Sequence, residues 1–224
     1  MATLLMCLAG PMQSWGTTSR FDERDTQLEP SKSGVLGLVC AALGRDRAEP
    51  VADLVALRMG VRVDREGIPM RDYQTATGVV ASSGKADANR TVVSQRYYLS
   101  DAVFLVALEG ERELLAHIHK ALRAPYWPLS LGRKSFVPSR PVFIPDGLRD
   151  GSLLKVLEST ALLTEHDTRQ EMQQRRVVVE DDDEGTVRVD QPIAPFSERR
   201  FGPRFVKTLH LTLGGGDASY STHA

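Results

Sequence analysis

The stretch AVFLVALEGERELLAHIHKALRAP, Ala102 to Pro125, gives the clearest indication of the architecture. Its opening segment, Ala102–Leu108, is apolar throughout, which is typical of a strand buried on both faces. From Glu111 to Arg123 the apolar side chains recur at helical spacing, and Pro125 then prevents continuation of the helix. We therefore predict a central strand followed by an amphipathic helix.

A strand and a helix are also expected near the start of the chain. Thr3–Ala9 is a short, nearly continuous apolar run and predicts a buried strand. Val35–Leu43 has apolar residues at helical spacing, Ser31 or Ser33 can cap its start, and Gly44 can end it.

Two further strands complete the predicted core. Leu57 to Asp64 alternates between apolar and polar residues, which predicts a half-buried strand with Arg58, Arg62 and Asp64 on its open face. The stretch Ser135–Ile144 supplies a candidate fourth strand. The order strand, helix, strand, strand, helix, strand is the split βαβ pattern, so we predict an α+β, ferredoxin-like fold.

A long insert separates the second and third predicted strands. Gly67–Ser100 is far longer than a usual hairpin connection, and it carries cations, amides and aromatic residues around a glycine-rich middle. We predict a flexible-tipped hairpin. Residues 1–145 are expected to form the main domain with this insert at about 67–100, and residues 146–224 a small, mostly β C-terminal extension packed on it.

The C-terminal part is less regular. Leu153–Leu163 fits either a helix or a strand. Arg176–Val179 and Thr186–Val189 flank the acidic run Glu180–Glu184, which predicts a hairpin with an acidic loop, and Phe205–Leu213 is expected to be the last strand.

Composition narrows the class of protein. The net charge is −1, with 42% hydrophobic and 25% charged residues, so any nucleic acid must contact a local basic patch. Cys7 and Cys40 lie in apolar runs, which favours buried thiols in a reducing compartment. The sequence shows neither a basic segment before its first apolar run nor a run long enough to span a membrane. We expect a cytoplasmic protein that contacts no membrane.

Three basic clusters predict a groove for single-stranded RNA, because aromatic rings stack on bases while cations attract the backbone. They lie in the opening loop and the helix start that follows it, in the insert, and in the Gly132-Arg133-Lys134 turn. The candidate RNA-binding residues are Trp15, Arg20, Arg24, Ser31, Lys32, Ser33, Gly34, Arg71, Tyr73, Arg90, Arg96, Gly132, Arg133 and Lys134. The alternative is that the cations are solvated surface and the aromatic residues, Trp15 included, fill the core.

Signals for catalysis are weak. His117 and His119 are two residues apart on a predicted helix, so they do not share a face as metal ligands would. The run Glu180–Glu184 could attract Mg²⁺, but a solvated loop is the simpler interpretation. We predict no catalytic residue, no metal and no cofactor.

Four blocks of sequence carry a more specific signal. LAGPMQSWG (Leu8–Gly16), SKSGVLGLVCAALG (Ser31–Gly44), MRDYQTATG (Met70–Gly78) and SLGRKSFVPSRPVF (Ser130–Phe143) are similar, in this order, to the fifth Cas protein family, the CasD subunits of type I-E CRISPR Cascade. The similarity runs from about Leu5 to Ile144 and is weaker in the C-terminal third.

This resemblance implies a modified ferredoxin-like (RRM-type) domain with an extended β-hairpin thumb. Such a subunit caps the 5′ handle of the CRISPR RNA, touches the backbone subunit and the large subunit of Cascade, and meets target DNA only indirectly, through the complex. Carried onto this chain, Gly67–Ser100 would be the thumb. The helix start Ser31–Gly34 and the turn Gly132–Lys134 would belong to the handle-binding surface, and the loop of Trp15 would shape a groove beside the RNA.

The resemblance also supplies an alternative. A related branch of the family cleaves precursor CRISPR RNA without metal, using tyrosine, histidine and lysine side chains. Tyr73 and Lys134 are the candidates for two of these roles here, but no histidine lies in a matching block, and in type I-E systems a separate subunit cuts. We therefore expect a non-catalytic RNA-binding subunit, with a metal-independent endoribonuclease or a pure assembly protein as the alternatives.

Overall fold

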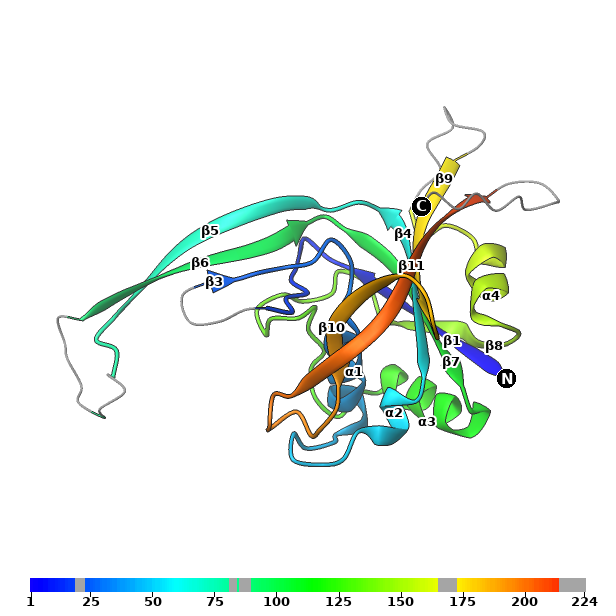
Figure 1. The fold of residues 1–224 in the computed structure, drawn as a ribbon, viewed down its shortest axis with the longest axis horizontal. Helices are drawn as coiled ribbons and strands as arrows, with labels where there is room; N and C mark the ends of the chain where they lie inside the picture. Colours follow the sequence, from blue (N-terminus) through cyan, green and yellow to red (C-terminus); the bar gives the residue numbers. More distant parts are fainter. Residues whose placement is uncertain (19–22, 81–83, 85–89, 165–172, 214–224) are drawn as a thin grey trace.

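A computed structural model describes residues 1–18, 23–80, 84, 90–164 and 173–213. A seven-stranded antiparallel sheet in the order β10-β11-β9-β4-β7-β1-β8 forms the body, with helices on both faces (Figure 1). A long two-stranded arm extends from one side of this body (Figure 1). The prediction of a mixed α+β class is confirmed.

The centre of the sheet contains the strands that the apolar runs predicted. β1 (Ala2–Ala9) lies between β7 (Val103–Gly110) and β8 (Phe143–Asp150), and β4 (Arg58–Arg65) pairs with the other edge of β7. β1 is buried along its whole length and β7 along all but its last residue. A strand buried on both faces needs apolar residues at every position, which explains why alternation is missing from both segments.

The fourth strand does not lie where it was predicted. Ser135–Ile144 is mostly loop, and the strand is β8, which starts only at Phe143. Pro138 and Pro141 have no N–H to donate to a sheet ladder, so this part of the segment forms loop instead. β8 also crosses the domain boundary expected at residue 145.

Three helices cover one face of the sheet: α1 (Lys32–Leu43), α2 (Ala52–Val55) and α3 (Arg112–Arg123). Of the two serines considered as caps of α1, Ser31 performs the role, since its Oγ accepts a hydrogen bond from the Gly34 N–H at 3.3 Å. Gly44 ends the helix in the left-handed conformation, with φ of +73°.

The opposite face is covered by α4 (Leu153–Ser159). The segment Leu153–Leu163, which fitted either a helix or a strand, therefore begins as a helix. This covering contradicts the prediction that Arg62 and Asp64 face solvent. Arg62 is fully buried, and its Nε donates to Asp64 Oδ1 at 2.6 Å. The alternation of β4 assigned its apolar and polar side chains to the two faces of the sheet correctly, but α4 buries the face that carries Arg62 and Asp64.

The C-terminal strands extend the same sheet in an order that differs from the prediction. β9 (Gln173–Asp181) and β10 (Thr186–Pro192) do not form a hairpin, because β11 (Phe201–Leu213) lies between them. β11 is long enough that one half pairs with β10 and the other with β9. β9 in turn pairs with β4, so the sheet is continuous between the two parts of the chain.

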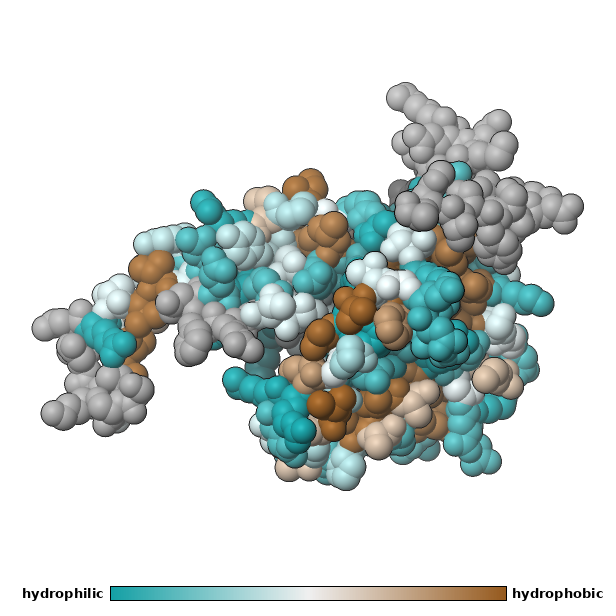
Figure 2. Space-filling view, in the orientation of Figure 1, coloured by the Kyte–Doolittle hydropathy of each residue, from teal (hydrophilic) through white to brown (hydrophobic). Residues whose placement is uncertain are grey.

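The insert forms an antiparallel hairpin of β5 (Ile68–Thr77) and β6 (Thr91–Ser100). β6 also pairs with two short strands, at its C-terminal end with β2 (Met12–Gln13) and near its middle with β3 (Glu23–Arg24). Hydrophilic side chains predominate on the visible face of the arm, with a hydrophobic band towards its outer end (Figure 2). The pairing to β2 and β3 fixes the opening loop of the chain against the arm.

Both cysteines are buried, as their apolar neighbours predicted. Burial raises the pKa of the Cys7 thiol, and it raises the pKa of Cys40 to about 11, so both thiols are protonated at neutral pH. Within the described ranges, no helix has the length and apolar character needed to cross a membrane. The same residues contain no group of three or more His, Cys, Asp or Glu side chains placed to hold a metal ion.

Candidate functional site

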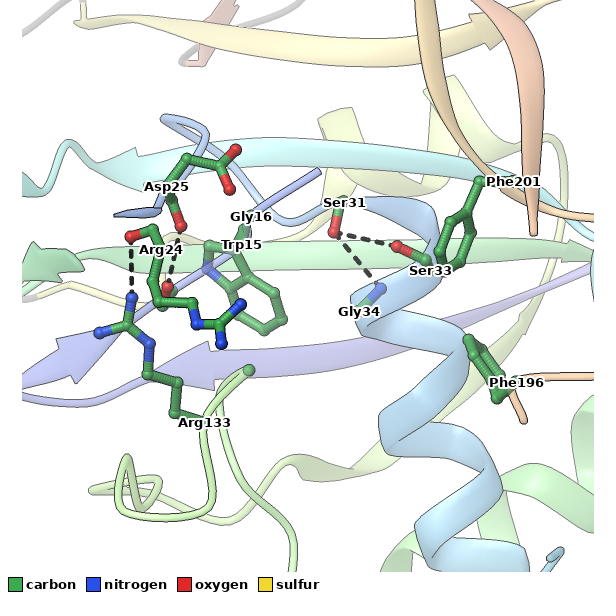
Figure 3. Close-up of a pocket in the computed structure, with 12 residues that line it drawn as sticks. Trp15, Gly16, Arg24, Asp25, Ser31, Ser33, Gly34, Arg133, Phe196 and Phe201 are labelled. Carbon is green, nitrogen blue, oxygen red and sulfur yellow. Dashed lines mark hydrogen bonds between the residues drawn. The ribbon is translucent and has the colours of Figure 1, made fainter. Parts of the chain in front are cut away.

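An open pocket of about 320 Å³ lies at the start of α1 (Figure 3). Segments far apart in the sequence form it: the loop after β2, the strand β3, the first turn of α1, the turn around residue 132, and the β10–β11 connection with the start of β11. The residues that line it are Ser14, Trp15, Gly16, Arg24, Asp25, Ser31, Ser33, Gly34, Gly132, Arg133, Phe196 and Phe201. Seven of these are among the residues proposed from the sequence.

Arginines from three separate segments lie close together, and two of them, Arg24 and Arg133, line the pocket. Arg24 of β3 lies opposite Arg96 of β6 in the strand register, and the Arg133 guanidinium donates to the Arg24 carbonyl at 3.1 Å and to the Tyr97 carbonyl at 2.8 Å. Partial burial lowers the pKa of Arg133, and the nearby charges of Arg96 and Arg24 lower it further. Such mutual repulsion among cations is relieved when an anion binds between them.

The turn that presents Arg133 requires glycine. Gly132 has φ of +91°, and a Cβ at this position would lie 1.7 Å from the Ser14 carbonyl oxygen. The turn is closed by a hydrogen bond from the Leu131 N–H to the Phe136 carbonyl at 2.8 Å. The Arg133 guanidinium lies 5.4 Å from the centre of the Phe136 ring, which holds the cation over an aromatic face.

Trp15 forms the inner wall of the pocket. The residue is 1% exposed, and its indole Nε1 donates to Gln13 Oε1 at 3.2 Å. A Cβ on Gly34 would lie 2.8 Å from the indole ring, so glycine at this position lets α1 approach the ring closely. Of the two roles considered for Trp15, the structure shows the core plug, with one part of the residue lining the pocket.

The first turn of α1 contributes Ser31, Ser33 and Gly34, but not Lys32. The Ser31 and Ser33 hydroxyls are 3.5 Å apart at the edge of the pocket (Figure 3). Lys32 is buried instead, and its Nζ donates to the Val55 carbonyl at 2.9 Å and to Glu180 Oε2 at 3.0 Å. Lys32 was a candidate RNA-binding residue, but the structure buries its ammonium group among these acceptors and does not place it in the pocket lining.

The arm separates the candidate residues that it carries. Arg71 and Tyr73 lie opposite Tyr97 and Gln95 in the register, whereas Arg96 lies opposite Asp72. Since successive side chains on a strand point to opposite faces, Arg71 and Tyr73 lie on the face away from Arg96. The structure therefore does not bring them to the pocket.

The remaining candidates either do not line the pocket or lie outside the residues that the structure describes. Arg90 directly precedes β6, where its carbonyl accepts from Gly78 at the outer part of the arm. Lys134 is exposed next to Arg133, although it does not line the pocket. Arg20 lies outside the described residues.

Five lining residues were not proposed from the sequence: Ser14, Gly16 and Asp25, which neighbour proposed residues, and two phenylalanines from the C-terminal part of the chain. Phe196 and Phe201 lie in and at the end of the connection between β10 and β11, and they face the arginines across the pocket (Figure 3). The available signal was a pair of phenylalanines on either side of the charged run Ser197–Arg200, just before the last strand. Only the fold shows that this connection reaches α1.

Comparisons with known proteins give consistent matches. Residues 3–207 match the model of a family described as CRISPR-associated protein (Cas_Cas5). The CRISPR system Cascade subunit CasD of Escherichia coli (strain K12) is 33% identical over 156 residues, which cover 63% of this chain and 69% of that protein.

Solved structures agree over nearly the whole chain. One described as "Crystal structure of Cas protein" is 49% identical, with a TM-score of 0.78, and the match covers 96% of this chain and 98% of the other. A chain of a "CRISPR RNA-guided surveillance complex" is 33% identical, with a TM-score of 0.79 and coverage of 94% and 90%.

Proposed function

This chain belongs to the Cas5 family of CRISPR-associated proteins, as a CasD-type subunit, and from this premise we propose that it binds the 5′ handle of a CRISPR RNA in a surveillance complex of the Cascade type. In this role it forms a fixed, non-catalytic end of the ribonucleoprotein. Target sequence is then read by pairing with the guide and not by this subunit.

The observation that carries the proposal is the meeting of Arg24, Arg96 and Arg133 beside a pocket with aromatic walls. Single-stranded RNA is commonly bound by cations that follow its backbone and by rings on which unstacked bases lie. The three arginines come from distant parts of the sequence, so their convergence is a property of the fold. Since the net charge of the chain is −1, this cluster of cations does not simply follow from a basic composition.

The architecture supports the remaining parts of the proposal. The split βαβ pattern has the chain order β1, α1, β4, β7, α3, β8 and the sheet order β4-β7-β1-β8, and this chain has both. We therefore assign these elements to a ferredoxin-like, RRM-type palm. The β5–β6 arm would be the thumb, which reaches towards the backbone and large subunits of the complex. Residues 146–224 would complete the palm, and the complex would act in the cytoplasm.

A binding measurement tests the handle assignment. We expect the protein to bind a labelled handle RNA roughly tenfold more tightly than an RNA of the same composition in permuted order, because hydrogen bonds to the edges of unstacked bases depend on which base stands at each position. Fluorescence anisotropy at several salt concentrations provides the two dissociation constants. Equal affinity for both RNAs would favour a pure assembly protein.

Absence of catalysis is a separate expectation. This expectation is supported by the place of the two candidate side chains, since Tyr73 lies on the face of the arm away from Arg96 and Lys134 does not line the pocket. We expect no specific cleavage when the protein is incubated with repeat RNA in EDTA and the products are resolved on a denaturing gel. Specific cleavage that the Tyr73→Phe variant abolishes would establish the endoribonuclease instead.

A further inference from the structure

We infer that the C-terminal strands supply the base-stacking half of the RNA pocket, and that a buried network of Lys32, Glu180, Asp190 and Arg204 holds this half in position. The inference rests on the proposed function and adds two things to it. Phe196 and Phe201 become RNA-contacting residues, and the four buried charges become positioning residues.

The two phenylalanines face the cationic side of the pocket. Phe196 and Phe201 are both half-buried, and they lie across the opening from Arg24 and Arg133 (Figure 3). The ring of Phe196 lies 4.0 Å from the position that a Cβ would occupy on Gly37, so it rests against α1. A nucleotide with its phosphate on the arginines can place its base on these rings, and such stacking strengthens binding roughly 5- to 150-fold per base.

The connection that carries these rings is anchored at both ends. β10 ends at Pro192 and β11 begins at Phe201, so Asp190 lies just before the connection and Arg204 just after it. Arg204 donates to both carboxylate oxygens of Asp190, with Nε to Oδ1 at 2.6 Å and Nη2 to Oδ2 at 2.9 Å. This bidentate pair fixes the two strand ends relative to each other.

The same network joins the connection to α1. The Lys32 N–H donates to Asp190 Oδ2 at 2.8 Å, and the Lys32 ammonium donates to Glu180 Oε2 and to Gln191 Oε1, each at 3.0 Å. Glu180 Oε1 also accepts from Arg204 at 3.1 Å. Ser31 and Ser33 of the pocket are the chain neighbours of Lys32, so the network sets the distance between the two walls.

The network has the properties of a rigid positioning device. Two cations balance two anions, and each of the four side chains is at most 11% exposed. Removing one partner leaves a buried charge without its counterion, which disturbs the packing around it. Because the network touches no open surface of the pocket, it affects RNA only through the placement of the walls.

The test compares full-length variants for affinity towards the labelled handle RNA and for salt dependence. We expect the Phe196→Ala/Phe201→Ala variant to bind about tenfold more weakly with an unchanged salt slope, since no phosphate contact is lost. We expect Glu180→Gln to weaken binding several-fold, again with an unchanged slope. This direction is informative because removal of a negative charge near RNA would by itself strengthen binding.

Arg62→Met provides the matched control, because it breaks a buried ion pair on the opposite face of the sheet. It should lower the melting temperature without changing the affinity of the folded protein. Affinity lost equally in Glu180→Gln and Arg62→Met would make the network merely structural and overturn its positioning role.

Wild-type affinity in the phenylalanine variant, together with weaker binding by the Arg133→Ala variant, would overturn the stacking role of Phe196 and Phe201 and leave the proposed function standing. If the wild-type protein does not prefer the handle RNA, the proposed function itself fails.

Discussion

The variant in which Arg24, Arg96 and Arg133 are all replaced by alanine is expected to bind handle RNA on the order of 100-fold more weakly at ~0.1 M salt. Arg24 and Arg133 line the pocket, and Arg96 lies close enough to Arg133 to lower its pKa. If each guanidinium contacts one phosphate, the slope of log association constant against log salt concentration should become less steep by about 2. Each contact to a single strand contributes about 0.7 to the magnitude of this slope. Anisotropy titrations at four salt concentrations measure both quantities.

A matched variant separates this effect from a general loss of positive charge. Arg112, Lys120 and Arg123 are exposed on α3, and none of them lines the pocket. Their replacement by alanine removes the same charge and should leave the affinity nearly unchanged. A comparable loss in both triple variants would show that the RNA responds to net charge and not to the arginine cluster.

Replacement of Arg62 by methionine is expected to lower the free energy of unfolding by about 3–5 kcal/mol, which corresponds to roughly 6–20 °C in melting temperature. The guanidinium pairs with Asp64 and donates to the carbonyls of Leu157, Thr160 and Ala161 at the end of α4. Without it, the Asp64 carboxylate and these carbonyls remain buried with fewer donors. Thermal and urea unfolding followed by circular dichroism measure the change.

The companion variant Arg62→Met/Asp64→Leu tests the reason for this loss. With both charges removed, no buried anion is left uncompensated, so a substantial part of the stability should return. If the double variant is as unstable as the single one, the loss arises from the helix carbonyls and not from the uncompensated carboxylate.

The central elements could be predicted because their signals are local. The apolar runs Thr3–Ala9 and Ala102–Leu108 and the periodicity of Glu111–Arg123 contain the information that sets strand or helix. The serine and glycine at the two ends of α1 act through hydrogen bonds and backbone angles within a few residues. Such features do not depend on distant parts of the chain.

Apart from the misplaced fourth strand, whose prolines are visible in the sequence, the errors in the fold concern contacts between distant segments. Arg62 looks like a solvent-facing residue until α4, about a hundred residues later, covers it. The order of β9, β10 and β11 depends on pairings that no local pattern encodes, and β9 and β10 were therefore mistaken for a hairpin.

The same reasoning applies to the site. The sequence indicated Arg24, Arg133 and the serines of the α1 start because glycine turns and cation clusters are visible in it. Whether Lys32 is buried depends on Glu180, which lies far along the chain. Phe196 could be recognised as a pocket residue only after the C-terminal strands were seen to join the sheet.

Photo-crosslinking of a handle RNA that carries 4-thiouridine, followed by mass spectrometry of the attached peptides, tests most directly whether this cluster of arginines contacts the RNA. We expect crosslinks in three peptides, around Arg24, around Arg96 and around Arg133, and their loss when excess unlabelled handle RNA is added. Crosslinks confined to the outer surfaces of α3 and α4, with none in these three peptides, would contradict the account.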